Sequence, residues 1–356
     1  MYFKQIIDEI GDSLNDTCSK WAGDNSSRVK EAVNEFLFLD FLTLLSWDFL
    51  QKDGLVTTVA EYITGTVTVT NGSASVTGSG TTFTSGMVGR RILPSGSNKS
   101  YKITGYGSAT SLTIESAYEG TTVSGVNYSI AKDRIDLPRW IDDPKRIYRI
   151  VDRDNNKVLT QLSRQDMERA YGAKGNVQDP NFYSPAPRVR TSYSTGTVAA
   201  SSNSSVLTGT STAWTSSGIE QFDLIRIGNY VYTVSSVDSD TQITLVDLTQ
   251  ETILAGTAYS AVVDRWQVDF YPMPKNLRSY QVVALQLIPR LVNAYDVPIL
   301  PDNWHYILVK GGRVKMLKHN QDSNYTVEQE ELIGILKRFI SQNNRENDRT
   351  ERFSIT

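Results

Sequence analysis

Apolar side chains recur every three to four residues near the start of the chain, beginning at Phe3 and ending at Leu14. This spacing predicts an amphipathic helix. Residues 24–27 then offer N-cap side chains for a second helix, which becomes apolar nearly all round over residues 36–50. Because a helix that is hydrophobic on all sides is buried on all sides, we expect that segment to pack against other helices, those of other subunits included.

Helical spacing returns near the end of the chain. Pro301 and Asp302 predict the start of one helix, and residues 326–329 form a capping box that predicts the start of the last one. Gly311-Gly312 lies inside the first of these helices, at a cost of about 1 kcal/mol per glycine relative to alanine. We therefore expect a close helix contact there. The apolar face of the last helix consists of Leu332, Ile335, Leu336, Phe339 and Ile340.

The pattern between these helical ends has a period of two. In residues 64–85, Val67 and Val69 alternate with threonines, and a second alternating run through Val76 follows Asn71-Gly72. Two alternating runs joined by Asn-Gly predict a β-hairpin with a type I′ turn. A flexible Ser/Gly linker would not keep this period.

The same stretch recurs further along the chain at an offset of 131 residues (195 − 64). Agreement at one offset predicts two copies of one β module, over residues 64–131 and 195–263. The matching segments are 64–67 with 195–198, 110–114 with 241–245, and 125–129 with 256–260. Residues 89–92 align with 224–227 after a small local shift, and Ser202-Asn203 replaces the Asn-Gly pair in the second copy.

Each copy contains several short strands separated by turn residues, which predicts a small sandwich or barrel. Between and after the copies, strands are expected at 134–138, 147–151, 266–272 and 280–287, with a short helix from Ser163 to Tyr171. The expected fold class is multidomain α+β, with a helical-bundle core from both chain ends, a strand-rich middle and two inserted all-β domains. The expected divisions are 1–63, 64–131, 132–194, 195–263, 264–341 and a C-terminal arm, 342–356.

Composition narrows the functional classes. The net charge is −3, so strong whole-protein attraction to nucleic acid or a membrane is not implied. Cys18 is the one cysteine, which excludes an intrachain disulfide. The first residues lack the pattern of a signal peptide, and the apolar stretch 36–50 is too short and too charged to span a bilayer.

Candidate catalytic groups are sparse. His305 lies near Asp302 at a helix start, and no nucleophile motif accompanies it. Asp152, Asp154 and Asn156 resemble the start of a calcium loop, but the glycine and the glutamate that such a loop needs are missing, so a hairpin turn is the better interpretation. Acids flanking Trp140 (Asp136, Asp142 and Asp143) lie in a proline-rich loop context. We expect no enzymatic activity, no metal and no cofactor.

Five segments resemble the head-to-tail adaptor, or connector, proteins of tailed and particularly short-tailed phages. Together the helical ends and the middle cover well over half of the 356 residues. The segments are the aromatic helix stop at 45–49, the strand–Leu-Pro–strand region at 135–159, the short helix at 163–171, the Pro-x-Pro strand pair at 270–274 and the entry to the last helices at 296–305. The inserted modules look like immunoglobulin-like domains of phage structural proteins.

The resemblance implies a virion protein, assembled in the host cytoplasm, that forms a ring, usually a dodecamer, beneath the portal protein. Packaged DNA would pass through the ring without sequence-specific binding, a tail nozzle or tail tube protein would attach below, and no membrane would be involved. We expect the β modules to hold tail fibres or other tail proteins. The arm that would contact the portal contains Arg345, Arg349, Arg352, Phe353 and Ile355.

Two other classes of function stay open. Repeated Thr-rich β modules also suit an adhesin or glycan-binding surface protein, which would need surface aromatics such as Phe83, Tyr106, Trp214 or Tyr230. A hydrolase of the cell envelope would depend on Asp142 or His305.

Overall fold

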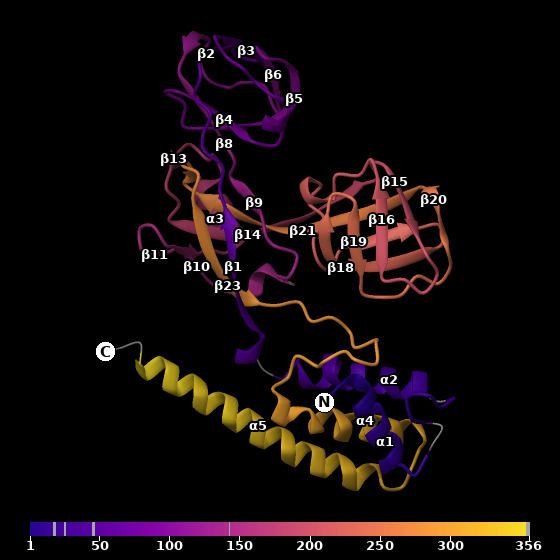
Figure 1. Ribbon diagram of the computed structural model, residues 1–356. Helices are drawn as coiled ribbons and strands as arrows, with labels where there is room; N and C mark the ends of the chain where they lie inside the picture. The colour runs from indigo at the N-terminus through magenta and orange to yellow at the C-terminus, as the bar shows by residue number, and fades with distance from the viewer. Residues whose placement is uncertain (17–18, 25, 45–46, 142, 354–356) are drawn as a thin grey trace.

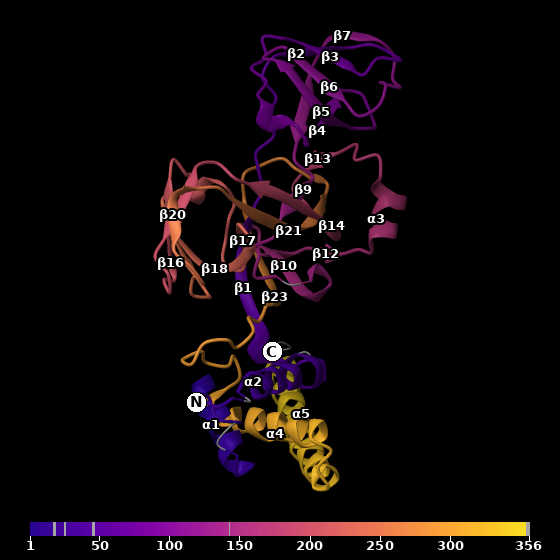
Figure 2. The same ribbon diagram turned by 90° about the vertical axis from the view of Figure 1, so that its right-hand side faces the viewer.

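The computed structural model describes residues 1–16, 19–24, 26–44, 47–141 and 143–353, with side chains described as far as residue 341. Figures 1 and 2 show a helical module at one end, a platform of strands in the middle, and two β modules, one at the far end and one beside the platform. Strands β1 to β23 outnumber helices α1 to α5 in these ranges. The expected helical-bundle core is therefore wrong. Three of the four hydrophobic cores consist of strands, and the helices form one terminal module.

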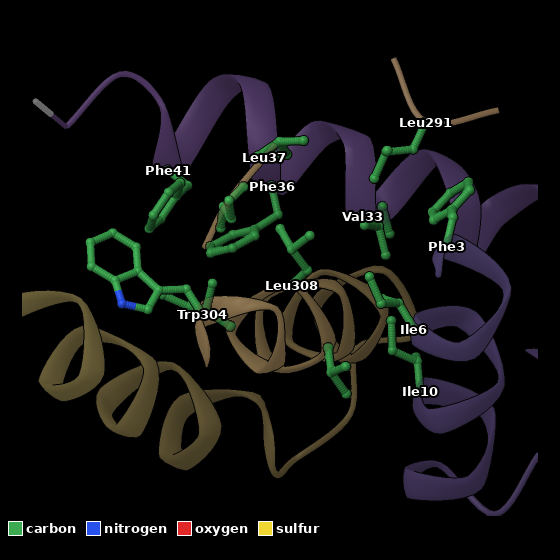
Figure 3. Packing of buried hydrophobic residues seen from close by; sticks show 14 of the residues in the cluster. Phe3, Ile6, Ile10, Val33, Phe36, Leu37, Phe41, Leu291, Trp304 and Leu308 are labelled. Carbon is green, nitrogen blue, oxygen red and sulfur yellow. The ribbon is translucent and has the colours of Figure 1, made fainter. Parts of the chain in front are cut away.

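The helical module brings both ends of the chain around one cluster of buried side chains (Figure 3). Leu332 and Phe339 of the last helix are buried in this cluster, so its apolar face is covered by the same chain. Its elements are α1 (Phe3–Ser13), α2 (Ser26–Glu35), a π-helix (Phe36–Phe41), 3-10 turns (Asp48–Leu50 and Asp302–Trp304), α4 (Tyr306–His319) and α5 (Tyr325–Phe353).

Two expectations about these helices are wrong. The segment 36–50 is not one continuous helix, because its helix ends at Phe41, and the Leu39 and Leu44 side chains are 64% and 41% exposed in the single chain. The capping box at 326–329 does not form, because α5 already begins at Tyr325 and Thr326 lies inside the helix.

Gly311 and Gly312 of α4 make the expected close helix contact. A methyl group on Gly311 would overlap the Phe36 ring, and one on Gly312 would lie 2.7 Å from both Ile10 and Val33. The absence of a side chain therefore lets α4 approach α1 and α2, and apolar burial at this crossing offsets the low helix propensity of glycine.

The platform packs two strand layers over a shared apolar core that includes Ile150, Val282, Val268 and Phe270. One layer has the antiparallel order β1-β23-β10-β11, and the other joins β9, β21, β14 and β12. Their bounds are β1 (Gln51–Thr57), β23 (Ser279–Leu285), β10 (Ile147–Asp152), β11 (Lys157–Val158), β9 (Arg134–Asp136), β21 (Tyr259–Tyr271), β14 (Phe182–Tyr193) and β12 (Thr160–Gln161). Helix α3 (Arg164–Tyr171) and the short pair β13 (Val177–Gln178) and β22 (Met273–Pro274) lie beside it. The N-cap bond from Asp166 N to Ser163 Oγ confirms the helix expected there.

Each β module is a small closed barrel, and the expectation of an immunoglobulin-like sandwich is wrong. In the first module, the ladder order β7-β2-β3-β6-β5-β4-β8 begins and ends on one stretch, because only Asn127 separates β7 from β8. That stretch pairs with β2 on one side and with β4 on the other, so the series of paired strands closes on itself. We call this module barrel 1. Its strands are β2 (Thr66–Val69), β3 (Ser75–Ser79), β4 (Arg91–Pro94), β5 (Tyr101–Ser108), β6 (Ser111–Ile114), β7 (Val123–Val126) and β8 (Tyr128–Ala131).

Barrel 2 repeats this closure. Its order is β20-β15-β16-β19-β18-β17-β21, and Ala258 separates β20 from β21. The further strands are β15 (Thr197–Ala200), β16 (Val206–Thr210), β17 (Leu224–Ile227), β18 (Tyr230–Ser239), β19 (Gln242–Leu245) and β20 (Ile253–Thr257).

Hydrogen bonds recur at the 131-residue offset. Tyr128 Oη donates to Thr64 O, and Tyr259 Oη donates to Thr195 O. The expected alignment of residues 89–92 with 224–227 is wrong by two residues. Ile92 pairs with Tyr101, and the residue that pairs with the equivalent Tyr232 is Ile225 rather than Ile227. Two further hydrogen bonds of barrel 1 recur in barrel 2. The Thr81–Ala109 bond corresponds to Thr212–Asp240, and the Tyr62–Thr82 bond corresponds to Tyr193–Ala213.

The first hairpin forms, but with a different turn. Only Gly72 has a positive φ (+78°), and Ser73 N donates to Thr70 O, as in a type II rather than a type I′ turn. In barrel 2, Asn203 takes the left-handed position (φ +57°). Gly72 N and Asn203 N donate to the equivalent carbonyl groups of Tyr118 and Thr249, so the second copy keeps the turn without glycine.

The two barrels are joined to the platform differently. Strand β21 lies in both barrel 2 and the platform, and it pairs with β14 along almost its whole length. A bulge at Pro187-Arg188, opposite Trp266, interrupts this ribbon between the two cores, where a bulge bends the strands. Barrel 1 is joined by the separate strands β8 and β9, and by a bond from Ser100 N to Ala173 O.

We predict that Gly311→Ala destabilises the helical module by about 1–3 kcal/mol, because the added methyl group overpacks the contact with Phe36. Gly334→Ala is the matched control, since open space surrounds that position in α5 and alanine should stabilise the helix slightly. Urea unfolding followed by far-ultraviolet circular dichroism would measure both changes. Equal effects of the two substitutions would contradict the close contact.

Candidate attachment interface

The expected portal-contacting arm is the outer end of α5. Residues 345, 349, 352 and 353 lie within this helix, although the structure does not describe their side chains, and Ile355 lies outside the described residues. Among the side chains described, which end at residue 341, the last apolar one packed on the helical core is Ile340. Helix α5 continues for 13 residues after it, to Phe353, or about 20 Å. Figure 1 shows this end of α5 running clear of the other helices.

The expected surface aromatics of the barrels divide into two kinds. Phe83 and Trp214 are 2% and 0% exposed, so the prediction that they lie on the surface is wrong. Both occupy the same barrel position, and Trp214 Nε1 donates to Tyr259 Oη at 2.8 Å. Tyr106 and Tyr230 are 41% and 37% exposed and remain available to a partner.

Barrel 2 also exposes aliphatic side chains. Val231, Leu248 and Leu254 are 56%, 48% and 73% exposed. In barrel 1, by contrast, the exposed large apolar residues beyond Tyr106 are Ile63 and Val88. Because aromatic and aliphatic surface favours protein contacts, the two barrels present different surfaces on the same fold.

A buried ion pair lies where barrel 2 meets the platform. Arg265 of β21 donates to both carboxylate oxygens of Asp223, at 2.7 and 2.8 Å, and Asp223 is fully buried. Burial alone would lower the pKa of Arg265, but the hydrogen bonds and charge of Asp223 outweigh it and raise that pKa. Arg139 Nε approaches Asp223 at 3.6 Å from the platform side.

Sequence analysis did not single out this pair. The available signal was Asp264-Arg265, two charged residues inside an otherwise apolar alternating strand. Asp264 binds Arg188 and Arg190 of the paired strand, so both charges at the bend of β21 have partners.

A groove of about 720 Å³ opens on the platform, lined by Asp143, Lys145, Ser163, Arg164 and Trp266 among others. Its polar groups have structural partners. Ser163 Oγ caps α3 and donates to Asp166, and Asp143 accepts from Lys145 N.

The other candidate residues are dispersed. His305 is fully buried, with Nε2 2.8 Å from Leu300 O. Asp152 ends β10 in the expected hairpin turn to β11, where it accepts from Asp154 N and Asn155 N. Asp136 binds Gln267, and Asp142 lies outside the described residues. Within the described ranges, no group of acidic, histidine or cysteine side chains is placed to hold a metal.

No protein-family model matches the chain, and no curated protein matches it. Solved structures similar to it include a chain titled "Phage phi92 endosialidase", with 11% sequence identity and a TM-score of 0.18. The match covers 64% of this chain and 31% of that one, so this chain spans about a third of its length. A likeness this weak carries no argument about fold or activity. None of the described helices is long and apolar enough to cross a membrane.

We predict that Asp223→Asn lowers the free energy of unfolding by about 3–5 kcal/mol, because it leaves Arg265 buried without its counter-charge. Glu168→Gln is the control, since its pair with Arg164 is exposed on both sides and contributes little. Chemical denaturation monitored by tryptophan fluorescence would compare them. A small loss for Asp223→Asn would mean that this pair does not stabilise the junction.

Proposed function

We propose that this chain is a structural attachment protein of a phage virion, in which the helical module joins a larger assembly and the barrels bind other proteins. The observation that carries the proposal is the separation of these parts. Barrel 1 and α5 lie at opposite ends of the molecule, and α5 continues about 20 Å beyond its packed face. A helix that continues beyond its own core suits packing against another subunit or the portal.

The finer assignment is a subunit of the head-to-tail adaptor ring, as the sequence segments at both ends suggest. In that arrangement the helical module and the outer end of α5 would contact the portal, and the barrels would hold tail fibres or other tail proteins.

A second candidate is an adhesin that binds host-surface glycans through the barrels. The exposed rings of Tyr106 and Tyr230 favour it, because aromatic faces pack well against sugars and other partly apolar ligands. The adhesin hypothesis does not require the helical module to oligomerise.

We predict that the full chain assembles into a ring on the portal protein encoded by the same phage, and that truncation after Asn343 prevents assembly. The truncation removes the outer end of α5 but leaves its buried face intact. Light scattering and electron microscopy of the mixtures would measure assembly. The control replaces residues 64–129 with a short linker, because Tyr62 and Ile130 are already hydrogen-bonded neighbours.

Equal assembly of the truncated chain would contradict the role given to α5. The adhesin would be favoured if the full chain stays monomeric with the portal and binds host polysaccharide. That binding should then be lost in Tyr230→Ala and retained in Tyr148→Ala. Tyr148 is exposed to a similar degree on the platform.

A further inference from the structure

The two barrels differ most at the position of the buried ion pair. Backbone hydrogen bonds identify the equivalent residues without reference to side chains: Ile103 N donates to Arg90 O, and Val234 N donates to Asp223 O. The preceding residues, Gly89 and Phe222, both have positive φ and donate to the same partner strand. Barrel 1 therefore has Arg90 where barrel 2 has Asp223.

The arginine that binds the Asp223 carboxylate in barrel 2 has an equivalent in barrel 1. Arg265 lies in β21, just after the part of that strand that closes barrel 2. Arg134 is its equivalent in barrel 1, at the 131-residue offset. In barrel 2 the Arg265 guanidinium is neutralised by Asp223. In barrel 1 the Arg134 Nε is buried without a hydrogen bond, and the nearest carboxylate, Asp269, is 4.0 Å away.

An open pocket of about 450 Å³ occupies this place in barrel 1, between the barrel and the platform. Five basic residues and two acidic residues line this pocket. Glu115 already accepts from Lys102 N and approaches Arg91, and Asp133 is buried. The basic residues are Arg90, Arg91, Lys102, Lys132 and Arg134.

Barrel 2 lacks this charge. The residues equivalent to Arg91, Lys102 and Lys132 are Leu224, Thr233 and Val263. The Arg90 side chain is half-buried and has no ion-pair or hydrogen-bond partner among the residues described, and burial lowers its pKa. Barrel 1 thus has two arginines, Arg90 and Arg134, in the lining of an open pocket, where barrel 2 has an arginine paired with an aspartate.

We propose that this pocket binds a carboxylate group of an external ligand, held by Arg90 and Arg134 as Asp223 is held by Arg265. Guanidinium groups bind carboxylates through two parallel hydrogen bonds, which is the geometry that barrel 2 shows internally. The carboxylate can belong to an acidic sugar or to an acidic peptide segment. The inference does not depend on the adaptor assignment.

The test is calorimetric titration of the full chain with two probes, sodium glucuronate and a polyglutamate peptide, at low salt. We expect a dissociation constant of about 1 mM or tighter for at least one probe. Binding of glucuronate alone identifies a small acidic ligand, and binding of the peptide alone identifies an acidic segment. Absence of binding for both probes overturns the proposal.

Arg90→Asp is the decisive variant, because it places in barrel 1 the carboxylate that barrel 2 already has. It should weaken probe binding at least tenfold and raise the thermal unfolding midpoint. Arg226→Asp, an exposed change of equal charge on barrel 2, should leave binding unchanged. Arg90→Ala should also lose binding, which keeps the test valid if the aspartate variant does not fold. Equal losses in Arg226→Asp, or retained binding in Arg90→Asp, would overturn the proposal.

Discussion

Strand β21 is the constraint on which the arrangement of this protein depends. Its 13 residues lie first in the core of barrel 2, through Ala261 and Val263, and then in the platform core, through Val268 and Phe270. Because β14 pairs with it across both cores, barrel 2 cannot turn relative to the platform without breaking a ladder of backbone hydrogen bonds. The buried Arg265–Asp223 pair lies at the bend and couples the two cores electrostatically.

The two barrels share one fold but differ at the junction with the platform. In barrel 2, charge at the junction is satisfied internally, and Val231, Leu248 and Leu254 are exposed on the surface. In barrel 1, the equivalent position is basic and open. Both copies keep the turns, the closing strand and the tyrosine that donates to the start of the barrel, while the residues at the junction differ between them. The helical module is attached through β1 and the chain after β23, at the other end of the platform.

The repeat could be predicted from the sequence because glycines, threonines and tyrosines that fix turns recur at one offset. The closed barrel could not, since strand alternation gives the same pattern in sandwiches and barrels, and closure depends on which strands β7 and β8 pair with. The junction was missed for a local reason. A two-residue error in aligning the segment around Arg90 hid its equivalence to Asp223. The helices were found, but their share of the fold was overestimated, because short Thr-rich strands carry a weaker hydrophobic signal than Leu-rich helices.

Native-state hydrogen exchange of the full chain tests the central claim most directly, which is that β21 makes barrel 2 and the platform one cooperative unit. The account predicts that amides of Ala261 and Val263 exchange with the same opening free energy as those of Val268 and Phe270, while barrel 1 opens separately. Exchange of the barrel 2 amides through an independent opening of lower free energy, with the platform still protected, would contradict it.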